Sequence, residues 1–424
     1  MKILFEKGEV LGLGRKFVEV TGRTITYVGD ERPDGCFDRV IDTKNKLIMP
    51  GLFNTHCHCA MTLFRGYGED MPLGDWLNTR IFPAEDKLTD RAVYVASLYA
   101  IAEMIRNGTA SFTDMYYFCE ETAKAVGESG IKANISRSIV SFDEDIDVTS
   151  DYRFREGREL FENFHNAFDG RLKVDMALHA EYTNVGKMVR AVADYAASHN
   201  ASVQIHLSET KSEHDACVAK YGYTPTEFFR RNGLFEANVT AAHCVWLTEE
   251  DMDILKESGA YAVHNPASNL KLGSGFMPLA RMLEKGVNVS LGTDGPASNN
   301  TLDMIKDMYL ASLAQKGHDL DPAKVKAQDI VKLATVNGAL SQQRPESGSI
   351  EVGKRADIIM LDLDTLNNIP SYDPYYTVVY SASGRDCVFN MVDGQILYEN
   401  GEFKTLDVEK IKSEMKDVVA HYFD

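Results

Sequence analysis

The sequence lacks three features that would each point to a membrane, a secretory route or a nucleic-acid partner. It has no apolar run of the ~18 residues that a membrane-spanning helix needs. Residues 1–8 contain no long apolar stretch and no small-residue cleavage site, so we expect no signal peptide. Lysine and arginine number 45 against 63 aspartates and glutamates, and the net charge of −18 argues against binding of nucleic acid.

Paired cysteines are also missing. The seven cysteines are odd in number and widely scattered, which predicts reduced thiols in a cytoplasmic protein. The composition that is present, 44% hydrophobic and 25% charged, is typical of a soluble globular protein. A chain of 424 residues is too long for one simple core. It fits a barrel of ~250 residues with a smaller accessory domain.

Strands alternate with helices through the middle of the chain. Helical stretches such as 89–107 and 184–198 separate apolar segments of strand length. Eight such alternations predict a (β/α)8 barrel of the TIM type over residues 50–345. The predicted strands are 47–57, 109–115, 132–140, 173–181, 202–208, 239–245, 259–264 and 288–293.

The two ends of the chain have a different pattern of apolar and polar residues. Residues 1–49 alternate apolar and polar residues between glycines, which is typical of short antiparallel strands joined by turns. Similar short strands return after residue 346. We therefore expect residues 1–49 and 346–424 to build one small β-sandwich domain together.

Two histidines follow the first predicted barrel strand. His56 and His58 are two residues apart, so on an extended strand their side chains point to the same face. A His-x-His pair alone often has no function. Cys57 and Cys59 alternate with the histidines and point to the opposite face, where we expect them to pack rather than bind metal.

Further metal ligands occur at other strand ends. His206 follows the fifth predicted strand, and Asp294 follows the eighth. Taken alone, His206 can be a buried, hydrogen-bonded histidine and Asp294 a turn residue. A closed barrel brings the carboxyl ends of all strands to one mouth. Together with His56 and His58 they make a ligand set that suits catalytic zinc, and iron or manganese suit the same ligands.

A carboxylate lies close to this predicted metal site. Glu209 follows His206 by three residues and can reach the mouth of the barrel. There it can shuttle protons for an attacking water. The alternative interpretation is a charge at the start of the following helix.

Motifs along nearly the whole chain resemble the amidohydrolase superfamily. Within it, the chain is similar to deaminases of S-adenosylhomocysteine and 5′-methylthioadenosine. The matching segments are 50–58, 60–66, 75–77, 206–210, 241–245, 264–273, 291–300 and 348–357. The resemblance implies a metal-dependent hydrolase barrel that converts an adenosine derivative to the inosine analogue and ammonia.

The resemblance also implies roles for the residues at the mouth. One divalent metal per subunit, usually zinc, is held by His56, His58, His206 and Asp294. Glu209 protonates the ring nitrogen next to the attacked carbon, and His243 hydrogen-bonds the attacking hydroxide. Asp294 takes the water proton and passes it to the departing amine. The segment 176–179 has no lysine, which favours one metal over two.

Substrate-binding residues follow from the same resemblance. Glu85 matches a carboxylate that binds ribose hydroxyls, and Trp76 either covers the ligand or packs in the core. His179 matches a substrate-side histidine. The family pattern Pro-His-Ser-Pro-Tyr-Thr is replaced here by Leu-His-Ala-Glu-Tyr-Thr at 178–183, which adds the carboxylate of Glu181.

Two arginines are candidates for binding the far end of the substrate. Arg137 matches a position that can pair with the amino-acid carboxylate of S-adenosylhomocysteine. Arg153 is a candidate for a second arginine of this kind, and its alternative is a surface residue. The sequence leaves the group at the ribose 5′ position open.

Three alternative functions stay open at this stage. A guanine or other aminoazine deaminase shares the metal set, but Glu85 argues against it. A chlorotriazine-type hydrolase often lacks Glu209 and His243, which are both present. A non-catalytic binding module would have lost metal ligands. We therefore predict a cytoplasmic enzyme with a small-molecule nucleoside substrate, and the resemblance implies a homo-oligomer.

Overall fold

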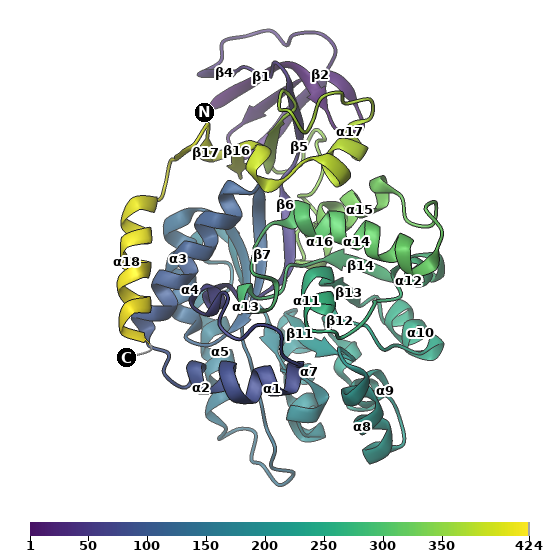
Figure 1. Cartoon of the computed structure of the whole chain (residues 1–424). Helices are drawn as coiled ribbons and strands as arrows, with labels where there is room; N and C mark the ends of the chain where they lie inside the picture. Colours follow the sequence, from purple (N-terminus) through teal and green to yellow (C-terminus); the bar gives the residue numbers. More distant parts are fainter. Residues whose placement is uncertain (423–424) are drawn as a thin grey trace.

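The barrel occupies the middle of the chain in the computed structural model, which describes residues 1–422. Eight parallel strand positions form its wall, and helices surround them (Figure 1). Among the described residues, no helix is both long enough and apolar enough to cross a membrane. The strands are β6 (Leu52–Cys57), β7 (Thr109–Tyr116), β8 (Lys132–Arg137), β9 (Leu172–Val174) with β10 (Met176–Ala177), β11 (Ser202–Leu207), β12 (Asn238–His243), β13 (Tyr261–His264) and β14 (Asn288–Leu291).

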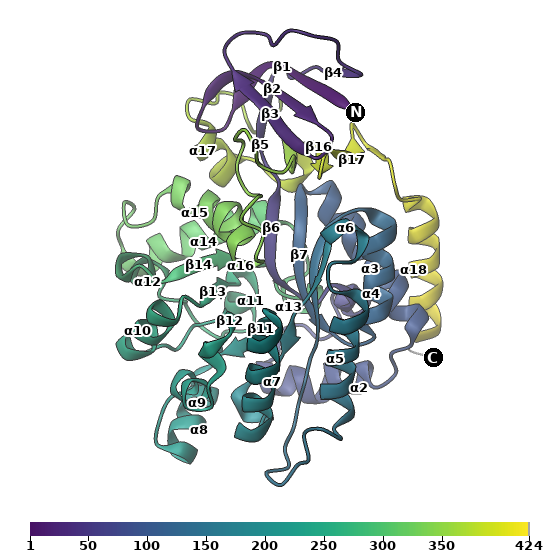
Figure 2. The same cartoon turned by 180° about the vertical axis from the view of Figure 1, so that it is seen from behind.

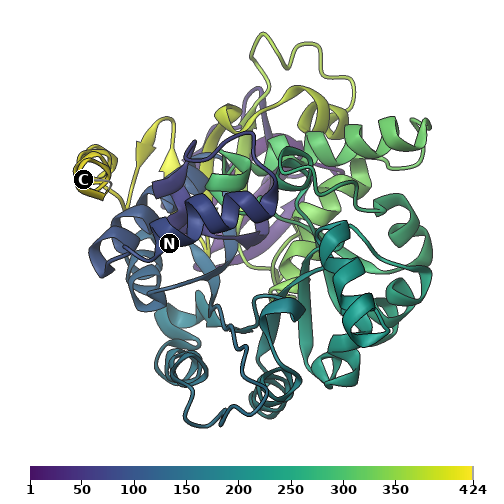
Figure 3. The same cartoon turned by 60° about the horizontal axis from the view of Figure 1, so that its bottom comes forward.

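Two parallel sheets join to close this barrel. One contains β6 to β9 and the other β10 to β14. A parallel bridge between Ile139 and Leu178 links the sheets on one side. On the other side, the Asp294 N–H donates to the His56 carbonyl at 3.0 Å, and the Thr55 hydroxyl donates to the Leu291 carbonyl at 2.9 Å. All strands therefore end at the same mouth, which faces the viewer in Figure 3.

Helices cover the outside of the barrel and confirm the two predicted helical stretches. Thr89 caps the first of these, α3, by accepting a hydrogen bond from the Ala92 N–H. The longer barrel helices are α3 (Asp90–Arg106), α4 (Cys119–Ser129), α5 (Tyr152–Phe164), α7 (Gly186–His199), α8 (Lys211–Tyr221), α9 (Pro225–Arg231), α10 (Glu249–Ser258), α12 (Leu279–Lys285), α14 (Met304–Asp319) and α15 (Ala327–Ala334). The short helices are α1 (Leu73–Trp76), α2 (Phe82–Glu85), α6 (Ala167–Gly170), α11 (Pro266–Lys271), α13 (Pro296–Asn299), α16 (Val336–Ser341) and α17 (Pro374–Tyr376).

Both chain ends contribute to one nine-stranded sheet beside the barrel (Figure 2). Phe5 and Phe389 lie three strand positions apart in this sheet, about 14 Å if the sheet were flat. Their ring centroids are only 5.5 Å apart. The sheet therefore curls over an apolar core in the manner of a sandwich. Its strands are β1 (Lys2–Val10), β2 (Gly14–Thr21), β3 (Thr24–Gly29), β4 (Arg39–Ile41), β5 (Lys46–Pro50), β15 (Ile358–Asp362), β16 (Cys387–Val392), β17 (Gln395–Glu399) and β18 (Glu402–Phe403).

The single strand predicted over 47–57 was wrong, because the chain changes sheets at Gly51. Strand β5 belongs to the small sheet and β6 to the barrel. The Gly51 N–H donates to the Asp357 carbonyl at 2.9 Å. A Cβ atom at Gly51 would lie 2.5 Å from the Ala110 Cβ, so the chain can pass between the two sheets here only with glycine.

A carboxyl-terminal helix that the sequence did not reveal packs on the barrel. Helix α18 (Val408–Tyr422) runs along α3 (Figure 1). The Tyr422 hydroxyl donates to the Ala84 carbonyl at 2.7 Å. The last part of the chain thus contacts the barrel as well as the small sheet, and the domain boundaries given above stay a prediction.

A buried ion cluster ties the small domain to the barrel. The Lys132 Nζ of β8 lies 2.7 Å from an Asp357 oxygen and 2.8 Å from an Asp393 oxygen. All three side chains are at most 4% exposed. Removing one member of such a cluster leaves charge in a medium that solvates it poorly.

We expect Lys132→Met to lower the free energy of unfolding by about 3–5 kcal/mol, because it leaves two buried carboxylates without their lysine partner. The measurement is urea unfolding followed by circular dichroism. The matched control is Lys124→Met, which removes an exposed lysine paired with Glu121 on α4 and should cost about 0–1 kcal/mol. Equal losses in the two variants would contradict a special role for the cluster.

Candidate active site

Four side chains from three strand ends converge at the mouth of the barrel. His56 and His58 come from β6, His206 from β11, and Asp294 from the turn after β14. The His58 Nε2 lies 3.3 Å from the His206 Nε2 and 3.3 Å from the Asp294 Oδ1. The His56 Nε2 lies 3.5 Å from the same Asp294 oxygen. The geometry thus brings together the ligand set proposed from the sequence.

Three spacings within this set are those expected between neighbouring ligands of one metal ion. Ligand atoms at about 2.0–2.1 Å from a tetrahedral zinc ion are about 3.3–3.4 Å from one another. The observed separations of 3.3–3.5 Å match this value. In addition, the His56 Nε2 is buried and has no hydrogen-bond partner among the described residues. A cation would supply the missing partner for this nitrogen.

The backbone orients two of the histidines. The His58 Nδ1 donates to the Met115 carbonyl at 2.5 Å, and the His206 Nδ1 donates to the His179 carbonyl at 2.8 Å. Because a carbonyl only accepts, each Nδ1 carries the ring proton. Each Nε2 is then free to face the centre as a neutral metal ligand.

Two serines hold the carboxylate. The Asp294 Oδ2 accepts hydrogen bonds from the Ser268 hydroxyl at 2.6 Å and the Ser298 hydroxyl at 2.8 Å. The other oxygen, Oδ1, faces the histidines. The Asp294 backbone lies in the left-handed region, with φ at 60°. Both serines lie within motifs seen in the sequence, but only the fold reveals that they contact Asp294.

A carboxyl group and an imidazole face each other beside the four ligands. The His243 Nε2 lies 3.6 Å from the Glu209 Oε2, and its Nδ1 lies 2.9 Å from the Asn269 Oδ1. The Ser274 hydroxyl donates to the Glu209 Oε1 at 3.3 Å. Burial raises the pKa of Glu209 to about 7. Glu209 can therefore both hold and release a proton near neutral pH.

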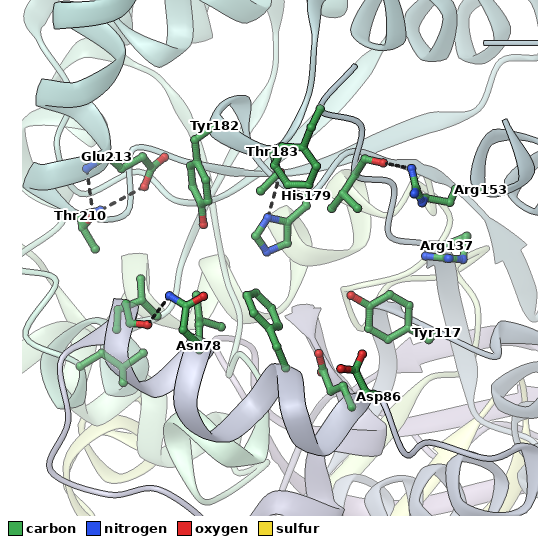
Figure 4. A pocket seen from close by; sticks show the side chains of 18 of the residues that line it. Asn78, Asp86, Tyr117, Arg137, Arg153, His179, Tyr182, Thr183, Thr210 and Glu213 are labelled. Atoms are coloured by element: carbon green, nitrogen blue, oxygen red, sulfur yellow. Dashed lines mark hydrogen bonds between the residues drawn. The ribbon is translucent and has the colours of Figure 1, made fainter. Parts of the chain in front are cut away.

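Two connected cavities open from this site. The inner one is lined by residues that include His58, His206, Glu209, His243 and Asp294. The outer one has a volume of about 1470 Å³ and opens toward solvent. Figure 4 shows side chains that line it. Glu85, His179 and Tyr182 are among the residues that line both cavities. A ligand can thus extend from the inner cavity, beside the four side chains, into the outer cavity.

The sequence-predicted residues on the substrate side divide between the two cavities. Glu85, at the end of α2, lies in the shared wall, and burial raises its pKa to about 7. Trp76 lines the inner cavity and is also packed in an apolar cluster with Phe64 and Ile81. Its position therefore agrees with both interpretations given above.

His179 lies between the two cavities, and the strand-end histidine His264 does not join the site. The His179 Nδ1 lies 3.1 Å from the Thr183 hydroxyl, and its ring centroid is 4.9 Å from that of His206. His264 is buried outside the group of ligand atoms, and burial lowers its pKa to about 3. We regard His264 as a neutral core histidine.

Arg137 and Arg153 line only the outer cavity. Arg137 ends β8, and Arg153 lies in the first turn of α5. Both side chains lie on the same side of His179 in Figure 4. They therefore face the part of a ligand that extends beyond the inner cavity.

The unusual Glu181 is buried against a second carboxyl group. It begins the short helix η3 (Glu181–Thr183) and is 2% exposed, and its carboxyl group interacts with that of Glu213. The Glu213 Oε2 in turn accepts the N–H groups of Glu209 at 2.9 Å and Thr210 at 3.3 Å. Burial and the neighbouring carboxylate of Glu213 raise the pKa of Glu181 to about 9. The pair therefore shares a proton at neutral pH and supports the turn that carries Glu209.

Known proteins are similar to this chain in sequence along nearly its whole length. Residues 47–397 match the amidohydrolase family. A 5-methylthioadenosine/S-adenosylhomocysteine deaminase of Dictyoglomus thermophilum is 44% identical over 98% of this chain and 97% of its own. A 5′-deoxyadenosine deaminase of Methanothermobacter thermautotrophicus is 40% identical over 99% and 98% of the two chains.

A solved structure of a known protein has the same fold as this chain. An adenosine deaminase from Xanthomonas campestris with bound zinc superposes with a TM-score of 0.94. It is 30% identical and covers 99% of this chain and 98% of its own. The fold and the ligand cluster thus define a metal-dependent hydrolase of the barrel type. The chain belongs to the amidohydrolase family, which confirms the resemblance and the fold class predicted from the sequence.

We expect Glu181→Gln to make the stability of the protein less sensitive to alkaline pH. In the folded protein the pKa of Glu181 is about 9, above its unfolded value of about 4.3. The folded state therefore binds more protons between these values. The stability that the protonated carboxyl contributes is complete below the unfolded pKa and is lost as pH rises toward 9.

Urea unfolding of the metal-loaded protein at pH 6 and pH 9 tests this expectation. Wild type should lose more stability between the two pH values than Glu181→Gln, whose amide cannot ionise. Glu159→Gln, on the exposed surface of α5, is the control and should behave like wild type. An identical loss in Glu181→Gln and wild type would show that Glu181 is already ionised at pH 6.

Proposed function

We propose that this chain is a zinc-dependent aminohydrolase that deaminates an adenosine derivative. The reaction adds water at the carbon that bears the amino group and releases ammonia, which leaves the inosine analogue. The observation that carries the proposal is the convergence of the four ligand side chains, three of whose ligand-atom separations are 3.3–3.5 Å, with the Glu209–His243 pair beside them. The names of the relatives support the choice of an adenosine derivative.

His56, His58, His206 and Asp294 would hold the metal, one ion per subunit. When bound, a divalent ion lowers the pKa of its water toward ~7 and so provides a nucleophile at neutral pH. Three imidazole nitrogens and one carboxylate favour zinc, and iron or manganese suit the same set. The zinc in the adenosine deaminase structure supports zinc over the other two.

The remaining polar groups would move protons. A protonated Glu209, whose pKa lies near 7, can donate to the ring nitrogen next to the attacked carbon. His243, fixed through its Nδ1 by Asn269, can hold the attacking water in line. Asp294 can take the proton of that water and pass it to the departing amine. The serines on its Oδ2 would keep the Oδ1 directed at the reacting atoms.

The cavities suggest how the nucleoside lies. With the purine amino group at the inner end, the ribose reaches the shared wall where Glu85 lies. A carboxylate can accept hydrogen bonds from two neighbouring hydroxyls, so Glu85 is our candidate for binding the ribose. His179 lies beside the same wall, and Trp76 closes the inner cavity. The 5′ group then points into the outer cavity. The homo-oligomeric state and the cytoplasmic location stay predictions.

Ammonia release from purified, zinc-loaded protein tests the proposed function. The substrates are S-adenosylhomocysteine, 5′-methylthioadenosine, 5′-deoxyadenosine, adenosine, guanine and cytosine. We expect one of the adenosine derivatives to be deaminated fastest. Chelation should abolish the activity and added zinc should restore it, with one metal ion per chain by elemental analysis. A dominant rate on guanine or cytosine, or activity that survives chelation, would contradict the proposal.

A second prediction concerns Glu209. Glu209→Gln should keep its metal, since Glu209 is not one of the four ligands, but lower kcat by about 10²–10⁴-fold through loss of general acid–base catalysis. The metal content and kcat of the variant are measured together. Glu257→Gln, an exposed change on α10, is the control and should leave both unchanged. Normal turnover in Glu209→Gln would remove Glu209 from the mechanism.

A further inference from the structure

The outer cavity carries an excess of negative charge. Eight acidic and three basic side chains line it. Each of the three basic side chains already has an acidic partner: Arg137 pairs with Glu156, Arg153 with Asp151 and Lys211 with Asp215. Of the eight acidic residues, five form no ion pair with any residue in 1–422: Glu85, Asp86, Asp90, Glu120 and Glu213. A ligand that enters this cavity therefore meets a net negative surface without an unpaired cation.

Arg137 is held on three sides. Its Nε donates to the Glu156 Oε2 at 2.7 Å, and its Nη1 donates to the Ser138 carbonyl. The centre of its guanidinium lies 5.0 Å from the ring centroid of Tyr117. Its side chain is only 13% exposed. A guanidinium in such a setting has both its charge and much of its hydrogen-bonding capacity in use.

Arg153 is held in a similar way. Its Nη1 donates to the Val140 carbonyl at 2.5 Å and lies 3.3 Å from an Asp151 oxygen. Its guanidinium stacks over the ring of Tyr152 at 4.7 Å. A dashed line from Arg153 marks its hydrogen bond to the Val140 carbonyl in Figure 4. Neither arginine thus offers an unpaired charge to an anion in the cavity.

We propose that the preferred substrate is an adenosine whose 5′ substituent carries no carboxylate, and that Glu156 sets this preference by occupying Arg137. The inference rests on the proposed function, which directs the 5′ group into the outer cavity. A carboxylate there has to displace Glu156 from Arg137 and also meets like charge from the acidic lining, which disfavours its binding. A neutral or cationic substituent meets neither obstacle.

A matched pair of substrates isolates the effect of the carboxylate. S-adenosylhomocysteine is compared with its decarboxylated analogue, in which hydrogen replaces the carboxylate at the same chain length, and with 5′-methylthioadenosine. For wild type, kcat/KM should be about tenfold or more higher for the two substrates without a carboxylate, as expected for like-charge repulsion in a partly desolvated site. A wild-type preference for S-adenosylhomocysteine over both would overturn the inference.

Glu156→Gln tests the residue that sets the preference. It should raise kcat/KM for S-adenosylhomocysteine by about fivefold, as expected for release of one partly exposed ion pair, and leave the other two substrates within about twofold. Glu159→Gln is the matched control, because Glu159 lies one turn further on α5, lines the same cavity and pairs with Arg155 instead. Equal changes for all three substrates, or the same gain in Glu159→Gln, would assign no specificity role to Glu156.

Binding without turnover separates this inference from the proposed function. In a Glu209→Gln background, calorimetry gives the Kd of each unreacted ligand, and the decarboxylated analogue should bind more tightly than S-adenosylhomocysteine. Adding Glu156→Gln should reduce the difference in Kd between the two ligands. If the two Kd values differ in this way but wild type releases no ammonia, the proposed function fails and the charge preference stands. If ammonia is released but S-adenosylhomocysteine binds equally well, only the charge preference fails.

Discussion

The site depends on the hydrogen bonds that close the barrel between its last and first strands. The Asp294 N–H donates to the His56 carbonyl, so the carboxylate that follows β14 is fixed against the histidines that end β6. Opposite them, His206 is aligned through the His179 carbonyl, which itself belongs to the junction between the two sheets. A shift of either junction by one residue would turn a ligand away from the centre, because neighbouring residues of a strand point to opposite faces.

Burial then determines how the surrounding carboxyl groups behave. It raises the pKa of Glu209, Glu85 and Glu181 above their ordinary values, but each group has different neighbours. Glu209 faces an imidazole and a serine hydroxyl and can exchange a proton near neutral pH. The side chain with the largest effect on Glu181 is another carboxyl group, that of Glu213, so Glu181 keeps its proton to higher pH. Burial thus makes Glu209 suited to proton transfer and makes Glu181 suited to supporting the turn that carries Glu209.

The barrel and the ligand set could be predicted because strand ends in a closed parallel barrel share one mouth. That rule needs only the order of strands and the residues that follow them, such as His206 and Asp294. The break at Gly51 was missed because an apolar run has the same pattern whether it continues in one sheet or crosses to another. The packing of helix α18 and the contact of Ser268 with Asp294 were missed because the partners lie far away in sequence. Ser298 is only four residues from Asp294, but its contact depends on the turn that follows β14. The ion pair of Arg137 with Glu156 likewise depends on how β8 and α5 pack.

The arrangement separates the chemistry of the site from its choice of substrate. Most of the groups that we propose to hold a metal or move protons line the inner cavity, and backbone carbonyls orient His58 and His206 there. The charges of the outer cavity come from the following helices and loops, such as Glu156 on α5 and Asp86 after α2. A substitution there changes the electrostatics at the far end of a ligand without moving the ligand atoms of the metal. Relatives with the same inner residues can therefore differ in the 5′ group they accept, and a carboxylate-binding arginine can be neutralised by a single acidic side chain on the neighbouring helix.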